Sequence, residues 1–136
     1  FIFDLFYDRL SKVEPVSERT PIFRNIHLSN VTGNDIKRIG YIKGIEEMPI
    51  SELSFSNMNI VAGKGFQAET ATDIRFNNVS FTVEEGPSLN IRQCKDIFLN
   101  DVRTKQPIAG QPVVNIEKDV EKVTVIHCDS TLVARN

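Results

Sequence analysis

Apolar and polar positions alternate in a six-residue phrase that recurs five times along the chain. The copies are Ile26–Val31, Leu53–Met58, Ile74–Val79, Ile97–Val102 and Val123–Cys128. Their first residues lie 27, 21, 23 and 26 positions apart. Alternation within each copy predicts a strand, and repetition of the same apolar columns predicts that these strands stack on one another.

The intervals between copies are long enough for a second strand in each coil. Such strands are expected at Tyr41–Ile45, Gly65–Ala68, Leu89–Ile91 and Val113–Ile116. The strands of a sandwich follow one another every 8 to 12 residues or so, and no Asn-Gly or Asp-Gly hairpin signal is present. The pattern therefore predicts one all-β domain over residues 1–136, a right-handed parallel β-helix (β-solenoid) of about five coils.

The fifth position of the phrase carries residues that suit a sharp bend. These residues are Asn30, Asn57, Asn78, Asp101 and His127. Asn and Asp tolerate left-handed backbone and bond to their own neighbouring main chain, as a bend between two strands requires. Stacked on successive coils, the three asparagines are also expected to form a ladder of side-chain amides.

Composition restricts function only weakly. The chain has 136 residues, with 16 basic and 18 acidic side chains that give a net charge of −2 and are interspersed. No basic stripe is present, so we expect no nucleic-acid partner. No apolar run approaches the roughly 18 residues of a membrane span, so we expect no membrane partner.

The cysteines and histidines favour structural roles. Cys94 and Cys128 fall on different apolar columns, too far apart around the coil for a disulfide, and are expected to be buried free thiols. His27 and His127 lie four coils apart, so they cannot share a proton or a metal ion. We expect His27 to face solvent, His127 to occupy a bend, and the chain to hold neither metal nor cofactor.

Pairs of carboxylates are candidate catalytic residues, because glycosidases use two of them as acid and base or as acid and nucleophile. Glu46-Glu47 and Glu84-Glu85 are adjacent in sequence, beside Pro or Gly, so they are expected at turns with solvated side chains. Asp4 and Asp8 can approach each other near the first coil, but no further motif supports them. No catalytic pair is predicted within the chain.

Three segments closely resemble one enzyme family. Pro21–Val31, Tyr41–Ile50 and Leu53–Met58 are similar to the last third of polygalacturonase-type pectinases, the bacterial branch of glycoside hydrolase family 28. Phe3–Asp8 looks like the strand that follows the catalytic region in that family, and Gly86–Ile91 fits the later coils. The resemblance implies a parallel β-helix and inverting hydrolysis of pectic galacturonides, in a secreted or periplasmic protein.

The same resemblance places the catalytic machinery outside this chain. The family motifs Asn-Thr-Asp, Asp-Asp, Gly-His-Gly and Arg-Ile-Lys do not occur here: Arg38-Ile39 is followed by Gly40, and Arg103-Thr-Lys105 lies too late in the chain. The one residue carried over is Tyr7, which matches a tyrosine at the edge of the family's sugar-binding cleft. An exposed tyrosine at a strand end is an equally good interpretation of Tyr7.

Two hypotheses follow. The chain is the C-terminal portion of a polygalacturonase-like hydrolase that acts on pectic polysaccharide or oligogalacturonide, inactive alone because it lacks both catalytic carboxylates. Alternatively, it is a non-catalytic β-solenoid that serves as a carbohydrate-binding or adhesive module. The opening Phe1–Tyr7 shows no cap, so a missing N-terminal part or a second copy is expected to cover that end. The tail 129–136 is expected to cover the other end.

Overall fold

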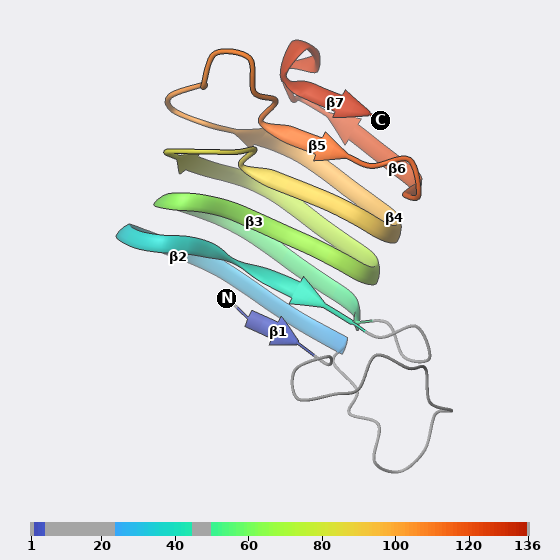
Figure 1. Cartoon of the computed structure of the whole chain (residues 1–136). Coiled ribbons are helices and arrows are strands. Elements are labelled where there is room, and N and C mark those ends of the chain that lie inside the picture. Colours follow the sequence, from blue (N-terminus) through green and yellow to red (C-terminus); the bar gives the residue numbers. More distant parts are fainter. Residues whose placement is uncertain (1, 5–23, 45–49, 136) are drawn as a thin grey trace, which may run out of the picture.

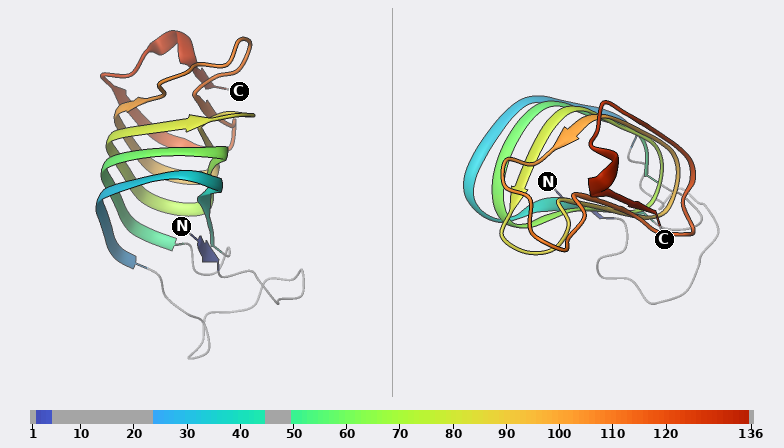
Figure 2. Two further views of the ribbon diagram at one scale, coloured as in Figure 1. Left: turned by 90° about the vertical axis from the view of Figure 1, so that its left-hand side faces the viewer. Right: turned by 90° about the horizontal axis from the view of Figure 1, so that it is seen from above.

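The computed structural model describes residues 2–4, 24–44 and 50–135, which form a parallel β-solenoid of about four turns. The elements are β1 (Ile2–Asp4), β2 (Arg24–Lys43), β3 (Ile50–Val83), β4 (Leu89–Arg103), β5 (Val114–Ile116), β6 (Glu121–Ile126), the 3₁₀ turn η1 (Ser130–Leu132) and β7 (Val133–Arg135). The long strands bend around the molecule and stack along its axis (Figure 1). Seen from above, the coils lie over one another around a shared interior (Figure 2).

Every strand pairing is parallel, and the register is the one expected from the repeated phrase. Ile26 pairs with Leu53, Ile74 with Ile97, and Ile97 with Val123. Leu53 and Ile74 both lie within β3, where the rings of Phe55 and Phe76 two residues further on are stacked 5.0 Å apart. The fold class and the column of phrase strands are therefore confirmed.

A second strand in each coil is also confirmed, although β5 begins at Val114 instead of Val113 and Ile45 lies outside the described residues. Ile42 pairs with Ala68, Ala68 with Ile91, and Ile91 with Ile116. All four side chains are buried, because alternate residues of a strand point to the same face. These strands form one sheet, which we call the second-strand sheet, and β1 joins it by pairing with Tyr41–Lys43.

A cluster of phenylalanines fills the interior. Phe55, Phe66, Phe76 and Phe81 are all at most 1% exposed. Phe66 meets the rings of Phe55 and Phe76 edge-on, with centroids 5.3 and 5.6 Å away. Such aromatic pairs contribute about 0.5–1.5 kcal/mol each beyond the area they bury.

The apolar columns are fully buried only in the middle of the stack. Leu53, Ile74 and Ile97 are at most 2% exposed, whereas Ile26 and Val123 are partly exposed. The expectation that all five members would be buried is therefore wrong at the two terminal coils. Within the described residues, the phrase strands of the first and last coils have a neighbouring coil on one side only.

The bends carry left-handed backbone, as expected. The φ angles at the fifth position of the phrase lie between 53° and 58°, at Asn30, Asn57, Asn78, Asp101 and His127. A second column immediately before each phrase has the same conformation and was not anticipated: Asn25, Glu52, Asp73, Asp96 and Lys122. Each phrase strand is therefore held between two left-handed residues, which turn the chain without a hairpin.

The described part of the tail, residues 129–135, packs against the last coil, which stays partly exposed at Val123 and Cys128. Asp129 caps η1 by accepting a hydrogen bond from the Thr131 backbone N–H at 3.0 Å, and the Thr131 bonds lower the pKa of the Asp129 carboxyl. Leu132 accepts a hydrogen bond from Val113 N–H at 2.8 Å and packs against the core. Seen from above, η1 lies across the outline of the coils (Figure 2).

Candidate functional site: a groove on the second-strand sheet

The outer face of the second-strand sheet is polar in a regular way. Each coil presents an amide or phenol, then a buried apolar residue, then a charged residue. The triplets are Tyr41-Ile42-Lys43, Gln67-Ala68-Glu69, Asn90-Ile91-Arg92 and Asn115-Ile116-Glu117. Because residues on either side of a buried strand position point outward, stacking the coils produces two partly exposed columns.

Two adjoining cavities open on this face, and together we call them the sheet groove. The larger has a volume of about 430 Å³ and the smaller about 330 Å³. The larger is lined by Arg38, Lys64, Gly65, Phe66, Gln67, Glu85, Gly86, Pro87, Asn90 and Asn115. The smaller is lined by Arg38, Tyr41, Ile42, Lys43, Gln67 and Glu69. Arg38 and Gln67 line both cavities.

The backbone approaches closely beneath the larger cavity. A Cβ atom added to Gly65 would lie 2.3 Å from the Pro87 carbonyl oxygen and 2.5 Å from that of Ser88. Glycine therefore lets the turn at 84–88 lie directly against β3. Phe66 N–H donates to the Ser88 carbonyl at 2.9 Å, which holds that turn at the edge of the groove.

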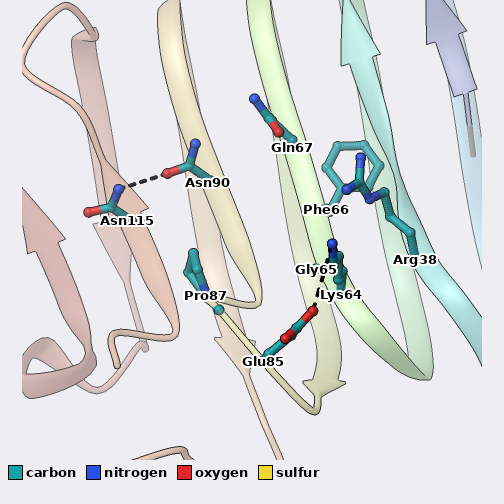
Figure 3. Close-up of a pocket in the computed structure, with 10 residues that line it drawn as sticks. Arg38, Lys64, Gly65, Phe66, Gln67, Glu85, Pro87, Asn90 and Asn115 are labelled. Carbon is teal, nitrogen blue, oxygen red and sulfur yellow. Dashed lines mark hydrogen bonds and ion pairs between the residues drawn. The ribbon is translucent and has the colours of Figure 1, made fainter. Parts of the chain in front are cut away.

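Side-chain amides on successive coils form a row along the groove. Asn115 Nδ2 donates to Asn90 Oδ1 at 2.7 Å, and Asn90 Nδ2 donates to Glu117 Oε2 at 3.2 Å. Figure 3 shows Gln67, Asn90 and Asn115 on neighbouring strands. An amide row of this kind offers both donors and acceptors to a hydroxylated ligand.

The charges of the groove are arranged with opposite signs as neighbours. Lys64 Nζ lies 3.7 Å from Glu85 Oε1, and Arg92 Nε lies 4.0 Å from Glu69 Oε1. Arg38 differs, because among the described residues its exposed guanidinium has neither an ion pair nor a side-chain hydrogen bond. An unpaired guanidinium where two cavities meet is suited to binding a carboxylate.

Acidic side chains line both cavities of the groove. Among the described residues that line it, the acids are Glu85 in the larger cavity and Glu69 in the smaller. Glu85 lies beside Lys64, and Glu69 lies beside Arg92. No group of three or more His, Cys, Asp or Glu that could hold a metal ion occurs in the described part of the chain.

The structure does not describe the tyrosine carried over from the family resemblance. Tyr7 and Asp8 lie outside the described residues, as do Glu46 and Glu47. Asp4 is described in its backbone, where it pairs with Lys43. Ile2–Asp4 therefore belong to the same sheet as the groove.

The remaining candidates occupy structural positions. Among the described residues, His27 contacts Asn25 on the exposed face at 3.2 Å, and His127 Nδ1 lies 2.9 Å from Asn100 Oδ1. Glu84 and Glu85 are at a turn and exposed, as expected. Both histidines are exposed as well, His127 at the predicted bend.

Both cysteines are free, but only one is fully buried. Burial raises the pKa of the Cys94 thiol to about 12. Cys128 is partly exposed because it lies on the last coil, so the expectation that both thiols would be buried is wrong for Cys128. Its sulfur accepts a hydrogen bond from Val102 N–H at 3.4 Å.

Sequence reasoning missed the residues that make the groove. The sequence indicates Arg38 only as part of an incomplete Arg-Ile-Lys motif. It places Gln67, Asn90 and Asn115 on second strands but does not identify them as a binding site. The repeated triplet of amide, apolar residue and charge was the available signal, because it repeats at the same register as the phrase.

Comparison with known proteins finds no similar protein. The chain matches no protein-family model, no curated protein and no solved structure. In the described part of the chain, no helix has the length and apolar character needed to cross a membrane.

Proposed function

We propose that this chain is the C-terminal β-helix portion of a polygalacturonase-like glycoside hydrolase, and that its sheet groove binds pectic galacturonides. The observation that carries the proposal is Arg38, which has no ion pair among the described residues and lies at the junction of two cavities lined by amides. Galacturonides present a carboxylate and several hydroxyls on each sugar. A guanidinium beside a row of amides complements both kinds of group.

The position of β1 supports the same proposal. β1 includes Phe3 and Asp4, the first two residues of the segment that resembles the strand after the family's catalytic region, and its pairing with Tyr41–Lys43 extends the sheet on which the groove lies. In the proposed arrangement, catalytic carboxylates come from a part of a longer protein that precedes the resembled segment. This chain then supplies a continuation of the cleft floor, and hydrolysis with inversion takes place beside it. The proposed parent protein is secreted or periplasmic.

A second candidate is a non-catalytic β-solenoid that binds carbohydrate. The pairing of Glu85 with Lys64 and of Glu69 with Arg92 favours it, because both groove acids are next to cations. The two candidates share the same groove and the same ligand class. They differ in whether a catalytic region accompanies the chain.

Calorimetric titration with trigalacturonate tests the ligand, and a reducing-sugar assay tests catalysis. The chain is expected to bind trigalacturonate and to release no reducing sugar from polygalacturonate. Arg38→Gln is expected to weaken binding about ten-fold or more, since a charge-assisted hydrogen bond contributes about 1.5–3 kcal/mol. The matched control is Lys37→Gln, which removes one exposed positive charge from a residue that does not line the groove.

Three results would contradict the proposal. One is the absence of binding to trigalacturonate at millimolar concentration. Another is equal weakening by the Arg38 and Lys37 variants, which would indicate attraction by net charge instead of a site. Turnover of polygalacturonate by the purified chain would show that it contains an acid and a base of its own.

A further inference from the structure

Within the sheet groove, one of the two cations of the larger cavity is already engaged by an acidic side chain of the protein. Lys64 and Glu85 both line this cavity, and their charged atoms lie 3.7 Å apart. Figure 3 shows the Glu85 carboxylate directed toward Lys64 from the turn that follows β3. Arg38 lines the same cavity without an ion pair among the described residues.

The backbone holds Glu85 in place independently of its side chain. Glu85 N–H donates to the Gly63 carbonyl at 3.1 Å, and Glu84 N–H lies 3.2 Å from the carbonyls of Ala62 and Gly63. Gly86 follows with a φ of 75°, which completes the turn. The turn therefore presents an acid to Lys64, while its own conformation depends on main-chain bonds.

The ion pair between Lys64 and Glu85 is long and exposed to solvent. The side chains of Lys64 and Glu85 are 56% and 68% exposed, and 3.7 Å is too long for a hydrogen bond. Exposed pairs of this kind contribute little to stability, because water solvates both charges well. An incoming carboxylate that also bonds to Arg38 or the amides can therefore replace Glu85 at small cost.

We infer that Glu85 acts as an internal competitor, whose carboxylate holds Lys64 until an acidic saccharide displaces it. This inference rests on the proposed function, since it takes the groove as the binding site and a uronide as the ligand. It adds a determinant of specificity: a neutral saccharide cannot displace Glu85, whereas a uronide gains Lys64 as a second cation. Removing the competing charge must then strengthen binding of acidic ligands alone.

The test compares Glu85→Gln with Glu84→Gln by calorimetric titration with trigalacturonate and with its carboxyl-reduced form. Both variants remove one negative charge from the same turn, but Glu84 does not line the cavity. Glu85→Gln is expected to tighten trigalacturonate binding about two- to five-fold, the range set by an exposed ion pair. Glu84→Gln is expected to change it less, and neither variant should alter binding of the reduced trisaccharide. Circular dichroism confirms that both variants are folded.

Every other outcome of these titrations contradicts either the inference or the proposed function. If wild-type protein binds trigalacturonate but both variants tighten binding equally, the effect is one of net charge and the inference is wrong. It is also wrong if Glu85→Gln weakens binding or leaves it unchanged. If the wild-type protein binds neither trisaccharide, the proposed function fails, and the inference fails with it.

Discussion

Single residues in left-handed conformation allow the chain to turn within each coil. Asn57 has a φ of 53°, and its side-chain oxygen accepts a hydrogen bond of 2.9 Å from Asn78 one coil above. The backbone thus takes a costly conformation at a residue that tolerates it, and the amide links neighbouring coils. Part of the expected amide ladder is therefore present, between Asn57 and Asn78.

Two substitutions at Asn57 are expected to separate the contribution of the left-handed backbone from that of the amide hydrogen bond to Asn78. Asn57→Val puts a β-branched residue at positive φ and removes the amide, so it should lower the free energy of unfolding by about 2–4 kcal/mol. Asn57→Gly removes the amide but accepts the φ angle, so it should cost about 1 kcal/mol. Urea denaturation measures both. Equal losses in the two variants would show that backbone strain is not what selects asparagine here.

Of the two columns of left-handed residues, the sequence predicts one and not the other. Asn30, Asn57, Asn78 and Asp101 identify one bend column from sequence, because Asn and Asp are the usual left-handed residues. The second column was missed since it includes Glu52 and Lys122, which seldom adopt this conformation. The register places Asn25 opposite Glu52, Asp73 opposite Asp96 and Asp96 opposite Lys122, and a local pattern does not reveal that alignment.

Strands, turns and the groove depend on one another at the level of elements. The turn at 84–88 lies against β3 only because residue 65 is glycine, and this turn carries Glu85 and Pro87 into the groove. The elements themselves were predictable from alternation and from the repeat. The groove was not, because its residues come from separate segments that only the register of the coils brings together.

Gly65→Ala is expected to damage fold and groove together. Its Cβ would clash with two carbonyl oxygens, and backbone cannot move aside as easily as a side chain, so a loss of at least about 1–3 kcal/mol is expected. Thermal denaturation measures the loss, and trigalacturonate affinity should fall as the turn is displaced. Gly110→Ala is the control, since its φ of 77° disfavours alanine but nothing lies within 4 Å of the added atom. If both variants lose the same stability, close packing at residue 65 is not the cause.

The whole molecule is a stack in which central coils are complete and terminal coils are partly exposed. η1 and β7 lie at one end, while Ile26 and Leu28 at the other are partly exposed in the described structure. We propose that a further part of a longer protein, or a second copy, covers this first coil.

The central claim is that an acidic saccharide binds in the sheet groove, and a titration of ¹⁵N-labelled protein with trigalacturonate followed by NMR tests it most directly. Amide shifts are expected at Arg38, Gln67, Asn90 and Asn115, all on one face. Residues on the outer face of the phrase strands, such as Ser54 and Arg75, should stay unchanged. Shifts confined to the phrase strands, or scattered over every basic residue, would contradict the account.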